Sequence, residues 1–172
     1  MCVANATPLI FLAKVSKLEL LSRIFNEIQI PHEVKVEVVD RGKELGYVDA
    51  MRVEEAILRG DIIVHKLEKE EISEAIRISK KFDIDIGEAQ VIILAKKKRE
   101  SAVIMDDLKA RRIAELYNLK PIGTVGILIE CVKQKILTRE DSIKILDTLI
   151  EKGFRLSIEM YKQFLSVLSE LN

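Results

Sequence analysis

The stretch Val103–Arg112, "VIMDDLKARR", joins three signals in a short span. An apolar, β-branched run ends in two adjacent acids, Asp106 and Asp107, and an amphipathic segment follows at once. This pattern predicts a buried strand, then a corner that carries both carboxylates, then a helix. Because ligands of open parallel sheets bind beyond the carboxyl ends of the strands, the corner is also a candidate site.

The rest of the chain repeats this alternation of short apolar runs and longer helical patterns. The expected strands are Cys2–Ala4, Ile28–Ile30, Ile62–His65, Ala102–Met105 and Lys120–Ile122. Between them, spacing near 3.6 predicts helices over Leu18–Phe25, Glu33–Asp40, Ala50–Leu58, Glu70–Phe82, Glu88–Lys97 and Leu108–Tyr117. Three closing helices are expected at Val125–Lys135, Arg139–Glu151 and Ile158–Leu171. The alternation predicts an α/β fold with a parallel sheet covered by helices on both faces.

Length and composition indicate one globular domain over residues 1–172, with residues 136–172 a helical C-terminal extension packed on it. Lys plus Arg and Asp plus Glu are equal at 28 each, so a nucleic-acid-binding face would have to be local. Cys2 and Cys131 show no metal-type spacing and read as free thiols of a reducing compartment. No apolar run reaches the roughly 18 residues of a membrane span, and a cytoplasmic location is expected.

Polar residues follow the first and last expected strands as well. Asn5 and Thr7 come after the first, where Thr7 is a favourable N-cap and Pro8 suits the first helical position. Thr124 comes after the fifth strand. In a parallel sheet, these residues gather at the same edge as the two aspartates.

Each candidate acid also has an ordinary structural explanation. Asp106 or Asp107 could simply cap a helix, and Glu88 could be a first-turn glutamate. Glu37 could be a solvated helix residue, whereas Glu88 opens an apolar helix in which a carboxylate needs a partner or a cation. Together they form an oxygen-only set that suits Mg²⁺ or Mn²⁺, the ions of phosphodiester hydrolysis.

Other catalytic chemistries find little support. His32 and His65 are the only histidines, no nucleophilic triad is evident, and no glycine-rich phosphate loop occurs. The basic run Lys96–Arg99 is explained by solvation and the helix dipole, or by RNA contact. Arg111 lies one turn beyond Asp107 on the same helix face, where it could pair with a carboxylate or hold a phosphate.

In these motifs the chain resembles the PIN-domain nucleases, and specifically the stand-alone prokaryotic subfamily related to VapC toxins. The matching pieces are "NATPLIFLAKVSKLELL", "IPHEVKVEV", "GEAQVIILA", "VIMDDLKARRIAELYNLKPIGTVGIL" and "GFRLS". They span nearly the whole chain, and Asp-Asp-x-x-x-Arg followed by Gly-Thr is the most specific. The resemblance implies a three-layer α/β/α sandwich with a small, mostly parallel sheet.

The resemblance also implies an activity, cleavage of RNA with bound Mg²⁺ or Mn²⁺. It places Glu37, Glu88, Asp106 and Asp107 in the acidic cluster, and it makes Glu88, Asp106, Asp107 and Asn5 the expected metal ligands. Thr7 would be the hydroxyl beside the first acid, with Arg111 and Thr124 as neighbouring support. Such relatives usually form homodimers and are often held inactive by an antitoxin, so both partners are expected.

The departure is at Asn5, where the family normally has Asp. An amide oxygen can still ligate a hard cation, but it adds no negative charge, and the missing charge should weaken metal binding. Two hypotheses follow: a weakened nuclease, or a catalytically silent PIN fold that binds RNA or protein, in which Asn5 is natural or a deliberate substitution. A phosphoacceptor receiver domain is a third and fits worse, because Gly123-Thr124 stands where a lysine is needed.

Overall fold

The structure, a computed structural model that describes residues 1–171, contains one five-stranded parallel sheet with the strand order β3-β2-β1-β4-β5. The strands are β1 (Cys2–Ala4), β2 (Ile28–Pro31), β3 (Ile62–His65), β4 (Ala102–Ile104) and β5 (Lys120–Ile122). They lie where the alternation of apolar runs predicts them, within one residue at each end. The order differs from the 2-1-3-4-5 order of receiver domains, which argues against that alternative.

Helices join the strands and close the chain. They are α1 (Ala6–Lys14), α2 (Glu19–Phe25), α3 (His32–Lys35), α4 (Gly42–Glu44), α5 (Val48–Arg59), α6 (Lys69–Phe82), α7 (Ile86–Lys98), α8 (Leu108–Leu116), α9 (Thr124–Lys133), α10 (Arg139–Glu151) and α11 (Ile158–Glu170), with a π-helical segment η1 (Val36–Arg41) between α3 and α4. Within residues 1–171, no helix is both long and apolar enough to cross a bilayer.

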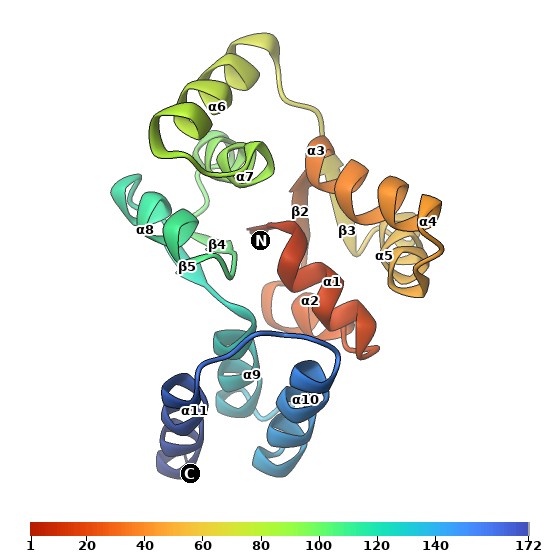
Figure 1. Ribbon diagram of the computed structural model, residues 1–172, viewed down its shortest axis with the longest axis vertical. Coiled ribbons are helices and arrows are strands. Elements are labelled where there is room, and N and C mark those ends of the chain that lie inside the picture. Colours follow the sequence, from red (N-terminus) through yellow and green to blue (C-terminus); the bar gives the residue numbers. More distant parts are fainter. Residues whose placement is uncertain (172) are drawn as a thin grey trace.

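The sheet separates two helical layers (Figure 1). The chain steps from β1 to β2 to β3 in one direction and then crosses back to β4 and β5 on the other side of β1. Because parallel crossovers are right-handed, the connecting helices of the two halves cover opposite faces. On one face α7 packs across β2, β1 and β4, and α6 packs on its outer side. The expected three-layer α/β/α fold is confirmed.

Helix α7 forms the centre of the core. Every residue from Gly87 to Ala95 is buried, which explains why this segment has no polar face. The lysines at its C-terminal end reach back to α6, where Lys96 pairs with Glu74 at 3.3 Å and Lys97 pairs with Glu71 at 2.9 Å. These ion pairs favour the structural explanation of the basic run over RNA contact.

The start of α1 corrects one expectation. The helix begins at Ala6, so Asn5 occupies the N-cap position and Thr7 does not. Asn5 has an extended backbone, and its N–H donates to the Ile104 carbonyl at 2.8 Å, so the sheet ladder continues through this residue before the helix starts. Its side chain makes no capping bond. The amide of Asn5 is therefore not used by its own helix.

The segment that carries Glu37 is not the regular helix that its periodicity predicts. Glu37 lies in the first turn of η1, between the single turns of α3 and α4. A π-helical turn inserts an extra residue per turn, and such turns are frequent at functional sites.

The last three helices gather at one end of the molecule, with α10 and α11 both packed on α9 (Figure 1). Thr138 caps α10 by accepting a hydrogen bond from the Asp141 N–H at 3.1 Å, a favourable N-cap contact. Phe164 and Leu168 of α11 are buried. The extension therefore attaches to the rest of the domain largely through α9.

We predict that Gly42→Ala lowers the free energy of unfolding by about 1–3 kcal/mol, measured by urea denaturation. A Cβ on Gly42 would lie 2.7 Å from the Ala50 Cβ, so α4 and α5 would have to separate. Gly87→Ala is the matched control, because its added Cβ would meet nothing closer than 3.7 Å. Equal effects of the two substitutions would show that the close contact at Gly42 is unimportant.

Candidate functional site

The candidate site lies at the carboxyl ends of β1 and β4, where the chain reverses its direction across the sheet. The register pairs Ala4 with Ile104, so Asn5 is level with Met105, and Asp106 follows one residue later at the same edge of the sheet. Such a switch point is where open α/β sheets bind ligands. Asn5 is 6% exposed, which places a polar amide almost wholly inside the protein at this edge.

Asp106 is held by the N-terminus of α9. The Thr124 N–H donates to Asp106 Oδ1 at 2.7 Å and the Thr124 hydroxyl donates to Oδ2 at 2.6 Å. Burial raises the pKa of the Asp106 carboxyl, while the Thr124 hydrogen bonds and the Arg111 charge oppose that rise. Thr124 is fully buried, so both of its donors depend on this carboxylate.

Gly123 makes room for Arg111 beside Asp106. A Cβ on Gly123 would lie 2.9 Å from Asp106 Oδ1, closer than Cβ atoms normally approach, and 3.2 Å from Arg111 Nη1, which would have to move slightly. The glycine is therefore required by space and not by its backbone angles, since its φ of −88° suits any residue. The structure thus brings together Asp106, Thr124 and Arg111, as the sequence predicts, through a glycine that sequence reasoning did not single out for this role.

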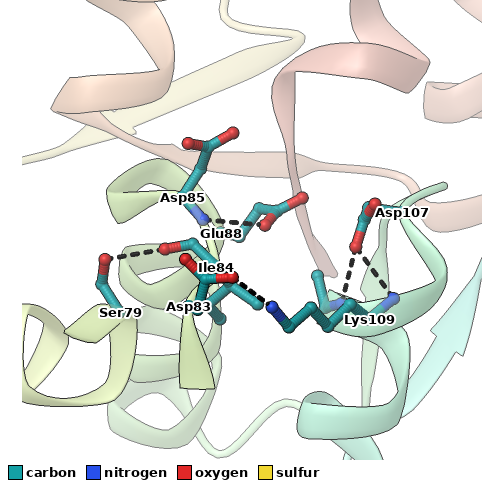
Figure 2. Close-up of polar contacts among 8 residues, drawn as sticks. Ser79, Asp83, Ile84, Asp85, Glu88, Asp107 and Lys109 are labelled. Carbon is teal, nitrogen blue, oxygen red and sulfur yellow. Dashed lines mark hydrogen bonds and ion pairs between the residues drawn. The ribbon is translucent and has the colours of Figure 1, made fainter. Parts of the chain in front are cut away.

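Asp107 has the structural role that helix capping predicts. Its side chain accepts from the N–H groups of Lys109 at 2.9 Å and Ala110 at 2.8 Å and so caps α8. Both bonds end on Oδ1, which leaves Oδ2 facing outward from the cap (Figure 2). Of the two adjacent acids, Asp107 organises its own helix and Asp106 binds a distant one.

Glu88 combines a capping contact with burial. Its Oε2 accepts from the Asp85 N–H at 3.1 Å, yet the residue is only 8% exposed. Burial raises the pKa of Glu88 to about 7, and the charges of Asp107, Asp85 and Glu37 add to the rise. Figure 2 shows its side chain in the space between Asp85 and Asp107. A carboxylate so placed titrates near neutral pH and attracts a cation.

Asn5 and Glu37 converge at Gly87. A Cβ on Gly87 would meet Glu37 Oε2 at 3.7 Å and Asn5 Oδ1 at 3.8 Å, so two side-chain oxygens border the small gap that this glycine leaves. Burial and the Asp85 charge raise the pKa of Glu37. Asp85 and the gap at Gly87 were missed from sequence, although an Asp-x-Gly-Glu start to a buried helix is a signal for both.

Thr7 lies on α1 and lines a groove together with Asp106, Asp107, Arg111 and Gly123. The Thr7 hydroxyl group therefore lies on a residue that lines the same groove as the two aspartates. The other acids approach from α7 and η1, on the Gly87 side. The site thus has two parts, one around Asp106 and Thr124 and one around Glu88 and Gly87.

The donor atoms fit a hard divalent cation, but not as a preassembled three-carboxylate cage. Among residues 1–171, no three His, Cys, Asp or Glu side chains are grouped closely enough to hold an ion. Mg²⁺ commonly binds through one or two carboxylates, with waters and substrate phosphates as its other ligands. The carboxylates together with the Asn5 amide oxygen suit that kind of site, in which the substrate completes the coordination.

We predict that Glu88→Gln stabilises the metal-free protein at pH 8 and not at pH 4.5. A folded pKa of about 7 against 4.5 for the unfolded chain means that the ionised Glu88 costs stability as pH rises from 4.5 to 7. The gain is at most about 3 kcal/mol at pH 8, by urea denaturation in EDTA. Glu115→Gln, an exposed change on α8, is the control; parallel pH profiles for wild type and Glu88→Gln would contradict the prediction.

We predict that Asp106→Ala costs about 1–3 kcal/mol of unfolding free energy, because it leaves the two buried Thr124 donors without an acceptor. Asp106→Asn keeps an oxygen that can accept from the Thr124 N–H, so it should cost less than about 1 kcal/mol while removing the charge. Thermal and urea unfolding measure both. A large loss for Asp106→Asn would mean that the charge itself holds α9.

The chain matches a family model described as "PIN domain" over residues 1–170. The comparison with curated proteins found no match. The family match covers every strand of the sheet and every side chain of the candidate site. The chain therefore belongs to the PIN-domain family, whose fold is generally that of nucleases.

Proposed function

We propose that this PIN domain is a metal-dependent endoribonuclease of the VapC-like, toxin type, which hydrolyses RNA phosphodiester bonds in the cytoplasm. The observation that carries the proposal is the convergence of Asn5 and Glu37 oxygens on the gap at Gly87, beside the buried carboxylate of Glu88. Acids buried without cationic partners lower stability, so their presence at a sheet switch point favours a functional role.

Mg²⁺ or Mn²⁺, held by Glu88, Asp106, Asp107 and the Asn5 amide oxygen, would supply Lewis-acid polarisation of the scissile phosphoryl group. Thr124 keeps the Asp106 carboxylate in one orientation through its two hydrogen bonds. Arg111, beside Asp106 at Gly123, is placed to bind a phosphate oxygen. Glu37 Oε2 borders the gap, and its raised pKa suits it to accept a proton from the attacking water.

The second candidate function is a catalytically silent PIN fold that binds RNA or protein. It is favoured by the amide at position 5 together with the lack, among residues 1–171, of any group of three acids close enough to hold an ion. With one negative charge fewer, the carboxylates of the site repel one another less, but together they attract a cation less strongly. The two candidate functions predict different results when the negative charge at position 5 is restored: RNA cleavage increases for a weakened nuclease and stays absent for a silent module.

We predict that Asn5→Asp raises Mn²⁺-dependent cleavage of single-stranded RNA on the order of tenfold, because metal affinity follows the number of ligand charges. The same substitution should lower the stability of the metal-free protein, since the new carboxylate is buried beside other acids. Cleavage assays and Mn²⁺ titration calorimetry measure the first effect, and urea denaturation in EDTA measures the second.

The double variant Asn5→Asp/Asp106→Asn is the control, and it should remain near background. Undetectable cleavage by both wild type and Asn5→Asp, with both proteins folded, would favour the silent module instead.

The toxin role extends the proposal to two protein partners, a second copy of the chain and an antitoxin. Exposed apolar side chains around α4 and α5 support protein contacts: Leu45, Tyr47, Val48 and Met51 are 52–66% exposed. Exposed apolar side chains that lie close together in the chain are candidates for a protein contact.

A further inference from the structure

A groove of about 1280 Å³ leads away from the candidate site toward the C-terminal helices. Thr7, Asp106 and Arg111 line it at the site, and the loop 153–157 with one side of α11 lines its far part. Small-molecule pockets are roughly 300–1,000 Å³, so this hollow suits a segment of a polymer better than a compact ligand. Its continuity with Asp106 links that polymer to the chemistry of the site.

The walls of the groove are two helices and the edge of the sheet. Val125, Ile129 and Lys133 project from successive turns of α9, and Met160, Gln163 and Val167 project likewise from α11. The two helices lie side by side at one end of the molecule, with β5 leading into α9 (Figure 1). The lining is mainly apolar, and it alternates with a few polar and charged side chains.

The charged side chains beyond the aspartates are mostly cations. Lys120, Lys133 and Arg155 line this part of the groove, and Glu130 is the one acid besides Asp106 and Asp107 among the described lining residues. Lys133 lies 3.9 Å from Glu130, the limit of an ion pair. Within residues 1–171, no carboxylate lies within 4.0 Å of the Lys120 or Arg155 side-chain nitrogens. Lys120 and Arg155 are therefore available to an anionic ligand, and Lys133 has only its contact with Glu130 at the limit of an ion pair.

Apolar walls with free cations match an unpaired nucleic-acid strand, whose bases are apolar on their faces and whose backbone carries a charge at each phosphate. A peptide that adds to β5 as a strand fits less well. Pro121 lies in the middle of this edge strand and has no N–H to donate. The half-buried rings of Phe11 and Phe25 add to the apolar lining of the groove, where Phe11 packs edge-on against Phe154.

We propose that this groove binds the single-stranded RNA segment next to the scissile bond, with Arg155, Lys120 and Lys133 contacting its phosphates. The inference rests on the proposed nuclease function and adds to it a role for the C-terminal extension. Arg155 lies in the loop between α10 and α11, so the extension supplies part of the substrate-binding surface as well as packing on α9.

The test compares two double variants that remove the same charge. Lys133→Gln/Arg155→Gln removes groove cations, while Lys144→Gln/Lys162→Gln removes exposed lysines of α10 and α11 that do not line the groove. Binding of a short fluorescein-labelled single-stranded RNA is measured by anisotropy in EDTA over a range of NaCl concentrations. Circular dichroism checks that each variant is folded.

The groove variant should reduce the slope of log K against log salt by about 1.4, at about 0.7 per lost phosphate contact, and weaken binding about tenfold at low salt. The control variant should bind like wild type, and duplex RNA of the same sequence should bind with little dependence on the groove cations. Equal losses in both double variants, or no change in slope for the groove variant, would overturn the proposal.

Two further measurements distinguish the groove from the proposed function. RNA binding that depends on the groove, without Mn²⁺-dependent cleavage, would support the proposed groove and reject the nuclease function. Mn²⁺-dependent cleavage that is equal in wild type and the groove variant at subsaturating RNA would support the nuclease function and overturn the role of the groove. Met160→Glu, examined by sedimentation, tests a protein occupant. A shift in oligomeric state with unaltered RNA binding would identify the groove as a protein interface and overturn the proposal.

Discussion

The two hydrogen bonds from Thr124 to Asp106 are the contact on which much of this structure depends. They join the end of β4 to the first residue of α9, and α10 and α11 join the rest of the domain mainly by packing on α9. The same contact fixes one carboxylate of the candidate site and sets the wall of the groove beyond it. Because Thr124 is buried, neither of its donors has water as an alternative partner, so structure and site are held by one interaction.

The other half of the site has the opposite energetics. Glu88 is buried close to the charges of Asp107, Asp85 and Glu37, and its ionised form therefore lowers the stability of the metal-free fold. A cation would relieve that cost, which is how such sites gain affinity. Asn5 reduces the repulsion by one charge while keeping an oxygen at the gap beside Gly87. An amide at position 5 thus favours the stability of the metal-free fold, whereas a carboxylate there would favour metal affinity.

Periodicity predicted the strands and most of the helices. In a parallel α/β fold the buried strands are short apolar runs, and each helix carries an apolar face with a spacing near 3.6, so both leave a local signal in the sequence. Periodicity was less successful where a tertiary contact overrides local preference. Thr7 is a good N-cap by type, but the ladder bond from Asn5 N–H to the Ile104 carbonyl places the start of α1 at Ala6. Glu37 lies in a π-helical turn that its spacing does not reveal. Asp106 and Asp107 are adjacent and chemically identical, and only the backbone decided which one caps α8.

By itself, the sequence determined the fold class, the sheet edge at which polar residues gather and the residue types available there. Those properties follow from the order of apolar runs and from the rule that parallel strands end together. The tertiary structure alone decided how the residues divide into two groups, one tied to Thr124 and one around Gly87, and that a groove connects the first group to α11. The physical reason is that hydrogen-bond partners, burial and the space left by a glycine depend on segments far apart in the chain, which no local pattern records.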